Sequence, residues 1–159
     1  MEIDKIVTGL LDENCYVLKK NNTCLVVDPG DDYHKIKDVV GDAKVLGVLL
    51  THSHFDHIGA LRNFLTKRSV KIFKKSSVEE KEYQIGDFSF QVLYTPGHTD
   101  DSVCYIIDNF FFSGDTLFKN SVGRTDLITG NTFKLGQSLV KIKNLKQDYI
   151  ICLLYTSDA

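Results

Sequence analysis

The chain has 159 residues, of which 43% are hydrophobic and 25% charged, so we expect one globular domain with its own core. A net charge of −2 and a pI near 6.2 disfavour nucleic acid as the main partner. Apolar runs stay well below the roughly 20 residues of a membrane helix, and the first residues lack a signal-peptide core. We therefore expect a cytoplasmic protein without membrane partners, with its four scattered cysteines reduced and mostly buried.

In chain order, short apolar runs predict strands at 2–8, 15–19, 24–27, 45–50, 70–73, 88–94, 102–107, 110–113 and 149–151. Helical spacing predicts helices at 32–39, 58–65 and 132–142. In the second helix the expected apolar stripe is Ile58, Leu61 and Leu65, and in the third it is Phe133, Leu135, Leu139 and Ile142. Many short strands with few helices indicate an α/β (α+β) protein of two sheets whose outer faces are covered by helices.

Histidines cluster directly after the run VLGVLL at 45–50, which is typical of a strand buried on both faces. The next residues, 51–57, read THSHFDH. On a helix His52 and His54 would diverge by about 200°, whereas in an extended segment His52, His54 and Asp56 point the same way. Neutral imidazole is a good ligand for zinc and iron, so the spacing predicts a metal site at a strand end, with a helix beginning near 56–57.

Two further candidate ligands follow strands in the same manner. His98 comes after the strand at 88–94 through Pro96-Gly97, and Asp115 comes after the strand at 110–113 through Gly114. The shared pattern of apolar strand, glycine and then His or Asp favours a common site. His34 lies in the predicted helix at 32–39, and we interpret it as a solvated surface residue.

The segments THSHFDH, TPGHT (95–99), SGDTLF (113–118) and GRTDL (123–127) resemble the metallo-β-lactamase superfamily. Within it they are similar to short relatives of glyoxalase II, the hydroxyacylglutathione hydrolases. The resemblance implies a four-layer αββα sandwich with a dinuclear metal site at one edge. It implies this arrangement: His52, His54 and His98 on the first metal, Asp56 and His57 on the second, Asp115 bridging, and Asp28 supporting the ligands.

The resemblance also implies an activity, the hydrolysis of a small-molecule thioester. Two Zn²⁺ ions, with Fe or Mn as alternatives, would lower the pKa of a shared water from 15.7 towards about 7 and yield hydroxide. His54, Asp56 and Asp115 form the expected catalytic set. Arg124 is a candidate for binding an anionic part of the substrate, and an ion pair with Asp126 or another carboxylate is the equal alternative. Because true lactamases of the superfamily often carry cysteine or serine at position 115, we do not expect a lactamase.

Two other functions stay open. A histidine pair with Asp115 could hold one Fe(II) as a facial triad, as in a persulfide dioxygenase of the same superfamily. A metal-stabilised binding module without catalysis is the second alternative. The sequence does not indicate an oligomeric state.

The C-terminal part departs from the family pattern. No histidine follows His98, although relatives supply a last ligand to the second metal after a strand like that at 149–151. Residues 152–159, CLLYTSDA, resemble a translated sequencing adapter, so we expect a metallo-β-lactamase-like domain at 1–151 that lacks its final loop and helix, and a non-native tail. We therefore expect one metal to bind much better than two. Asp100 and Asp101 stand where relatives tend to have a small residue or glycine. Two negative charges near the site would disfavour anionic substrates; we favour the alternative that both are solvated turn residues.

Overall fold

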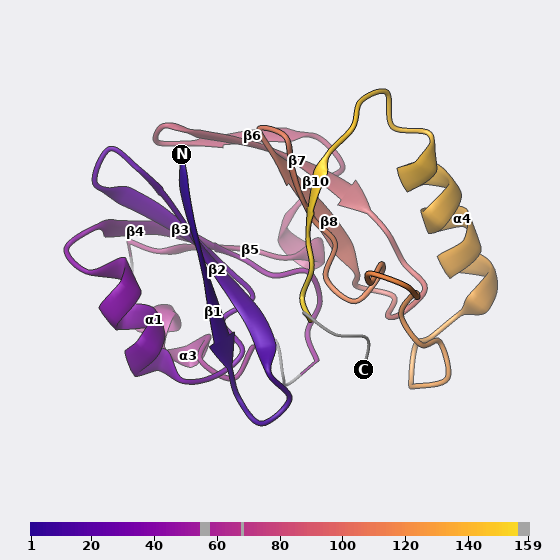
Figure 1. Ribbon diagram of the computed structural model, residues 1–159, viewed down its shortest axis with the longest axis horizontal. Helices are drawn as coiled ribbons and strands as arrows, with labels where there is room; N and C mark the ends of the chain where they lie inside the picture. The colour runs from indigo at the N-terminus through magenta and orange to yellow at the C-terminus, as the bar shows by residue number, and fades with distance from the viewer. Residues whose placement is uncertain (55–57, 68, 156–159) are drawn as a thin grey trace.

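Two five-stranded sheets form the centre of the protein, as a computed structural model describing residues 1–54, 58–67 and 69–155 shows (Figure 1). The first sheet has the order β1 (Glu2–Thr8), β2 (Glu13–Lys20), β3 (Thr23–Val27), β4 (Lys44–Leu49) and β5 (Lys71–Phe73). The second has the order β10 (Ile150–Cys152), β9 (Phe110–Phe112), β8 (Val103–Ile107), β7 (Phe88–Tyr94) and β6 (Glu82–Ile85). The β3–β4, β4–β5 and β9–β10 pairs are parallel, and the other pairs are antiparallel.

Helices cover the outer faces of both sheets. The helices α1 (Tyr33–Val40) and α3 (Arg62–Leu65) pack on the first sheet through buried Ile36, Val40 and Phe64. The helix α4 (Thr132–Lys143) lies on the second sheet, and a 3-10 turn spans Lys75–Ser77. The prediction of an αββα sandwich is therefore confirmed.

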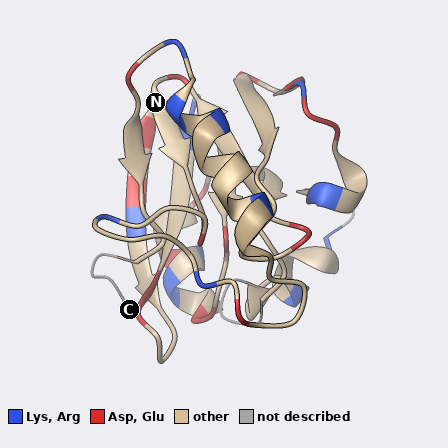
Figure 2. Ribbon diagram, turned by 90° about the vertical axis from the view of Figure 1, so that its right-hand side faces the viewer, with Lys and Arg blue, Asp and Glu red and all other residues tan. Residues whose placement is uncertain are grey.

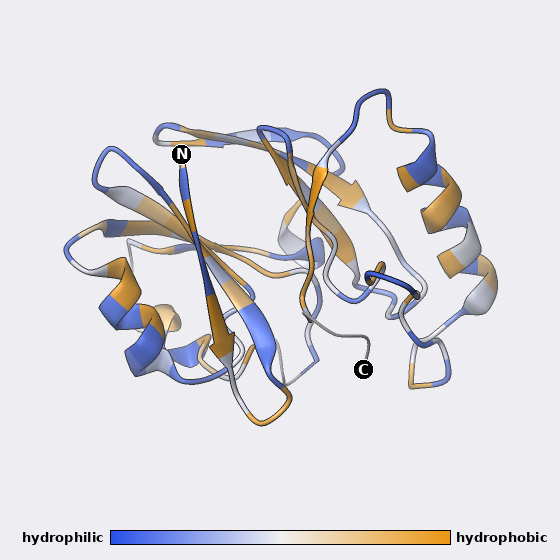
Figure 3. Cartoon of the chain, in the orientation of Figure 1, coloured by the Kyte–Doolittle hydropathy of each residue, from blue (hydrophilic) through white to orange (hydrophobic). Residues whose placement is uncertain are grey.

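The main core lies between the sheets, where side chains alternate along each strand. Leu49 of β4 enters this core, and its neighbour Val48 faces α1 and α3, so the run VLGVLL is buried on both faces as predicted. Figure 3 shows hydrophobic residues along much of the central strands and hydrophilic residues in many of the connecting loops. The hydroxyl of Tyr105 in β8 donates to the carbonyls of Leu50 and Phe73, at 2.7 and 3.1 Å, and so joins the two sheets.

The strand predictions agree with the structure to within two residues at each end, but β6 is missing from them. Its sequence EYQI follows a charged stretch and alternates between exposed and half-buried residues, so it gives a weak apolar signal. The sequence does contain one indication of β6: Gly86-Asp87 is typical of a tight hairpin turn, which implies a strand before β7. In the structure this pair joins β6 to β7, and Gly86 has a φ of 55°.

Two predicted apolar stripes need correction. The predicted helix 58–65 is interrupted: Ile58 is helical, residues 59–61 form a turn, in which the amide of Leu61 donates to the carbonyl of Ile58, and α3 begins at Arg62. The expected helix start near 56–57 lies outside the described residues. The buried residue of α3 is Phe64, whereas Leu65 is 59% exposed.

In α4 the predicted core residue Phe133 is 75% exposed. The face towards the sheet is instead formed by Leu135 and Ser138, which are buried, with Ile142 half-buried against the sheet. Gly97 permits this packing, because a Cβ there would lie 2.3 Å from the Cα of Leu135.

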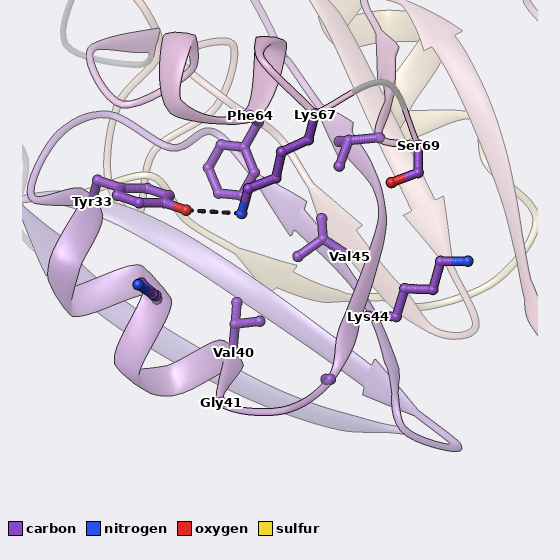
Figure 4. Close-up of a pocket in the computed structure, with 11 residues that line it drawn as sticks. Tyr33, Val40, Gly41, Lys44, Val45, Phe64, Lys67 and Ser69 are labelled. Carbon is purple, nitrogen blue, oxygen red and sulfur yellow. Dashed lines mark hydrogen bonds between the residues drawn. The ribbon is translucent and has the colours of Figure 1, made fainter.

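The surface is mixed in charge, and a cavity of about 270 Å³ lies between α1, α3 and the start of β4 (Figure 4). Tyr33 and Phe64 pack edge to face there, and Lys67 donates a hydrogen bond to the hydroxyl of Tyr33 at 3.0 Å.

Figure 2 shows basic and acidic residues interspersed over the face that carries α4. Within the described residues, no helix has the length and apolar character needed to cross a membrane.

The four cysteines are free and buried, as predicted. Burial is the largest cause of the raised pKa of their thiols, which reaches about 12 for Cys104.

Residues after β10 pack against β2. The carbonyl of Leu153 accepts hydrogen bonds from the side chains of Asn14 and Tyr16, and the carbonyl of Leu154 accepts one from the amide of Asn14. Leu154 is 2% exposed. The domain boundary at 151 and the foreign origin of residues 152–159 stay predictions.

Candidate metal centre

Three predicted ligand segments meet at one edge of the sandwich because of the directions of their strands. β7 and β9 are both antiparallel to β8, so they run the same way and end at the same edge. His98 follows β7, and Asp115 follows β9. The amide of Val103, at the start of β8, donates to the carbonyl of Thr51 at 2.8 Å, which attaches the segment after β4 to this edge.

The side chains of His52, His54, His98 and Asp115 converge there. Their candidate ligand atoms all lie within 4.8 Å of one another. Nε2 of His98 lies 3.2 Å from Nδ1 of His54 and 3.2 Å from Oδ2 of Asp115, and Nε2 of His52 lies 3.6 Å from the same oxygen. His52, His98 and Asp115 are buried, and His54 is half-buried. The extended course predicted for residues 52–54 thus brings the first two histidines together.

The tautomer of His98 is fixed by a backbone group. Nδ1 of His98 lies 2.8 Å from the carbonyl oxygen of Arg124. A carbonyl only accepts hydrogen bonds, so Nδ1 carries the proton and Nε2 presents its lone pair to Asp115 and His54.

A chain of hydrogen bonds fixes His52 in the same way. The amide and hydroxyl of Thr51 donate to the two carboxylate oxygens of Asp28, at 2.8 and 2.7 Å. The hydroxyl oxygen of Thr51 also lies 3.2 Å from Nδ1 of His52. Because its proton is directed to Asp28, this oxygen accepts from Nδ1–H, and Nε2 of His52 is left for the site. The supporting role expected for Asp28 therefore acts through Thr51.

The donor set fits a divalent cation. In a tetrahedral site with ligands at about 2.0–2.1 Å, neighbouring donor atoms are about 3.3–3.4 Å apart. The separations of 3.2, 3.2 and 3.6 Å among these nitrogen and oxygen atoms bracket that value. Three neutral imidazoles and one carboxylate suit zinc, iron or manganese.

The remaining predicted residues have different outcomes. Asp56 and His57 lie outside the described residues. His34 is exposed on α1, as predicted. The side chain of Arg124 forms the ion pair that the sequence left open, with Asp126 at 2.6 and 2.8 Å, and this guanidinium is the main cause that lowers the pKa of Asp126 to about 2.

Asp101 corrects another expectation, because it is half-buried and bonded rather than solvated. Its carboxylate accepts hydrogen bonds from the hydroxyls of Ser53, at 2.5 Å, and Thr99, at 2.7 Å. Asp100 is exposed, in agreement with the prediction. Sequence reasoning missed the hydrogen bonds that Thr51 and Ser53 make beside the histidines, although both residues are adjacent to His52 in the sequence.

Comparisons with known proteins agree with this geometry. The family model described as the metallo-beta-lactamase superfamily matches residues 8–81 and 76–152. The "Probable metallo-hydrolase YqgX" of Bacillus subtilis is 34% identical, covering 82% of this chain and 78% of its own length. A "Hydroxyacylglutathione hydrolase" of Hahella chejuensis is 38% identical over 80% of this chain, which spans 55% of that relative.

Solved structures give the same result. The crystal structure of ETHE1 from Myxococcus xanthus has a TM-score of 0.90 and 25% identity, covering 99% of this chain and 76% of its own. The crystal structure of the BLEG-1 B3 metallo-beta-lactamase has a TM-score of 0.91 and 29% identity, covering 98% of this chain and 92% of its own. The family match, the αββα sandwich and the histidine–aspartate cluster at its edge together show that this chain belongs to the metallo-beta-lactamase superfamily.

Proposed function

We propose that this chain is a metal-dependent hydrolase that cleaves a small-molecule thioester of the hydroxyacylglutathione kind. The observation that carries the proposal is the convergence of three histidines and Asp115 at one buried edge. Relatives named hydroxyacylglutathione hydrolases, 30–38% identical, support the substrate class. Because the chain spans only 55–62% of those relatives, the thioester remains part of the proposal.

In this proposal His52, His54, His98 and Asp115 hold the first cation. Asp56 and His57 would contribute to a second cation together with Asp115, and Asp56 would orient the attacking water. A bound divalent cation lowers the pKa of water from 15.7 towards about 7 and polarises the scissile carbonyl.

The protein's own contribution is to hold the donor atoms ready. Arg124 through its carbonyl, and Asp28 through Thr51, keep Nδ1 of His98 and of His52 protonated, so that both Nε2 atoms are directed towards the site. Burial of His52 and His98 restricts water to the open side at His54, which is half-buried. This preorganisation reduces the rearrangement needed when a cation and substrate bind.

Substrate contacts are proposed at two places. An apolar cavity of about 250 Å³ lies between the β1–β2 hairpin loop, which exposes Leu10 and Leu11, and the segments at Gly30 and Gly59. It suits the hydrocarbon part of an acyl group or thiol carrier. Arg124 is proposed to bind an anionic part of the substrate in competition with Asp126. Arg124→Ala should then raise KM for anionic thioesters, and Asp126→Ala should lower it. Equal KM values in both variants and the unchanged protein would remove Arg124 from the substrate site.

The central experiment is a thioester panel run on protein of measured metal content. S-lactoylglutathione, acyl-coenzyme A thioesters and a β-lactam are offered to the unchanged protein and to three variants. His52→Ala and Asp115→Ala should each lower thioester kcat by at least about a thousandfold, since the cluster is the proposed reaction centre. His34→Ala is the matched control, because it removes an exposed histidine from α1. Thioester turnover that persists in His52→Ala would contradict the proposal.

Iron-dependent persulfide dioxygenation is the second candidate. A histidine pair with Asp115 also satisfies an Fe(II) facial triad, and a similar structure, 26% identical with a TM-score of 0.85, is described as TTHA1623 in a di-iron-bound form. Oxygen uptake on glutathione persulfide by iron-loaded protein, without thioester turnover, would favour this candidate. A metal-stabilised binding module predicts neither activity at full metal loading.

A further inference from the structure

Two separate segments supply the histidines of the candidate centre, and they must keep a fixed relative position. One follows β4 and carries His52 and His54, and the other follows β7 and carries His98. Their candidate donor atoms lie only 3.2 Å apart between His54 and His98. A shift of a few tenths of an ångström in either segment therefore changes the geometry available to a cation.

Asp101 connects these two segments through its side chain. One carboxylate oxygen accepts from the hydroxyl of Ser53 at 2.5 Å, and Ser53 stands between His52 and His54. The other oxygen accepts from the hydroxyl of Thr99 at 2.7 Å, and Thr99 directly follows His98. Hydrogen bonds to a carboxylate are shorter and stronger than bonds between neutral groups, so this bridge suits a holding role.

The Thr99 side of the bridge is anchored in the protein interior. Thr99 and Ser102 are each 3% exposed. Their hydroxyl oxygens lie 2.5 Å apart, and the amide of Thr99 donates to the hydroxyl of Ser102 at 3.2 Å. Ser53 is exposed, so Asp101 links the more open segment that carries His54 to the buried turn at Thr99 and Ser102.

We propose that Asp101 is a positioning residue that ties Ser53 to Thr99 and thereby fixes His54 relative to His98. The inference rests on the metal ligands of the proposed function but not on its thioester substrate. Asp101 acts through its neighbours and is not itself proposed to touch the cation or the substrate.

The neighbouring Asp100 gives a matched control. It is exposed, and its recorded hydrogen bonds are made by its backbone, from its amide to Thr129 and from Lys75 to its carbonyl. Asp100→Ala and Asp101→Ala remove the same charge at adjacent positions. A purely electrostatic effect on a cation would therefore appear in both variants, whereas loss of the bridge appears only in the second.

The test is a double-mutant cycle in zinc affinity, measured by competition with a chromogenic chelator. Ser53→Ala and Asp101→Ala should each weaken zinc binding by about tenfold or more, as expected for groups that orient ligands. Asp100→Ala should change it by less than about threefold, and the double variant Ser53→Ala/Asp101→Ala should bind no more weakly than Asp101→Ala, because both changes break one bridge.

The Co²⁺ absorption spectrum of each variant reports ligand geometry without any turnover. Spectral changes in Ser53→Ala and Asp101→Ala, but not in Asp100→Ala, are expected. Equal affinity losses in the two aspartate variants, or additive losses in the cycle, would overturn the proposal. If Asp101→Ala does not fold, the zinc affinity of Ser53→Ala, a change at an exposed position, tests the proposal by itself. An unchanged affinity in that variant would contradict the positioning role of Asp101. Because zinc affinity and the Co²⁺ spectrum are measured without substrate, a failure to find thioester turnover would not affect the test of Asp101.

Discussion

Replacing Thr51 by valine removes one hydroxyl from beneath the candidate centre and keeps nearly the same shape. Thr51 is 2% exposed, and its hydroxyl donates at 2.7 Å to Asp28, which is fully buried. A hydrogen bond to a charged group contributes about 1.5–3 kcal/mol. We therefore expect the free energy of unfolding of the metal-free protein to fall by about 2 kcal/mol.

The same change should also weaken metal binding. Without the hydroxyl, Nδ1 of His52 loses the oxygen that lies 3.2 Å away and selects its tautomer. Loss of a group that orients a metal ligand typically lowers affinity by about 10–100-fold. Zinc affinity of Thr51→Val should therefore fall at least about tenfold.

Thr51→Ser is the matched control, because it keeps the hydroxyl and removes only a methyl group, at a cost of about 1 kcal/mol. Its zinc affinity should stay within about threefold of the unchanged protein, since the tautomer-selecting oxygen is retained. Urea denaturation with EDTA, followed by far-ultraviolet circular dichroism because the chain has no tryptophan, gives the stabilities. Equal zinc affinities in the valine and serine variants would refute the role of the hydroxyl.

Three further predictions concern the core, the thiols and the metal. Phe64→Ala should lower the free energy of unfolding by about 3–5 kcal/mol in urea denaturation, while Phe133→Ala, at a 75% exposed position, should change it by less than about 0.5 kcal/mol. Because the folded state raises the pKa of the Cys104 thiol to about 12, it holds a proton that the unfolded chain releases above about pH 8.5. The contribution of this thiol to the free energy of unfolding should be constant below that pH and should decrease as the pH rises towards 12. A free energy of unfolding in urea that does not change between pH 8 and 10.5 would contradict this. Zinc titration of the metal-free protein should give one site much tighter than any second, and two equally tight sites would contradict that expectation.

The strand framework was predictable because its signals are local. Each strand except β6 contains a short apolar run bounded by glycine, proline or charged residues, and alternating burial follows from the pleat. The placement of His98 and Asp115 at a common edge follows from two antiparallel steps through β8, so the site edge was also accessible from the sequence.

The apolar stripes failed where tertiary packing decided between neighbouring residues. Helical spacing alone allows either Leu65 or Phe64 to face the sheet, and the turn at 59–61 rotates the short helix so that Phe64 is buried. In α4 the close approach at Gly97 selects Leu135 and leaves Phe133 outside. Such contacts join residues far apart in the chain, so a periodic pattern does not contain them.

Residue identity also fails to reveal a backbone contact, and Arg124 is the clearest case. Its side chain suggests a substrate contact, yet the carbonyl of the same residue accepts the hydrogen bond that fixes His98. The position of that carbonyl depends on Gly123, where a Cβ would lie 1.8 Å from the carbonyl oxygen of Asp115 and 3.1 Å from the Cβ of His98. No side chain fits there without moving the backbone that carries two proposed ligands.

Gly123→Ala should therefore damage the centre more than Arg124→Ala. The alanine methyl must displace the backbone at Asp115, whereas Arg124→Ala keeps the carbonyl that binds His98. We expect zinc affinity to fall at least about tenfold in Gly123→Ala, by the same loss of ligand orientation, and to stay unchanged in Arg124→Ala. The chelator competition assay measures both, with the metal-free melting temperature as a check on folding. A loss of zinc affinity in Arg124→Ala as large as that in Gly123→Ala would show that the side chain, rather than the backbone of this segment, supports the centre.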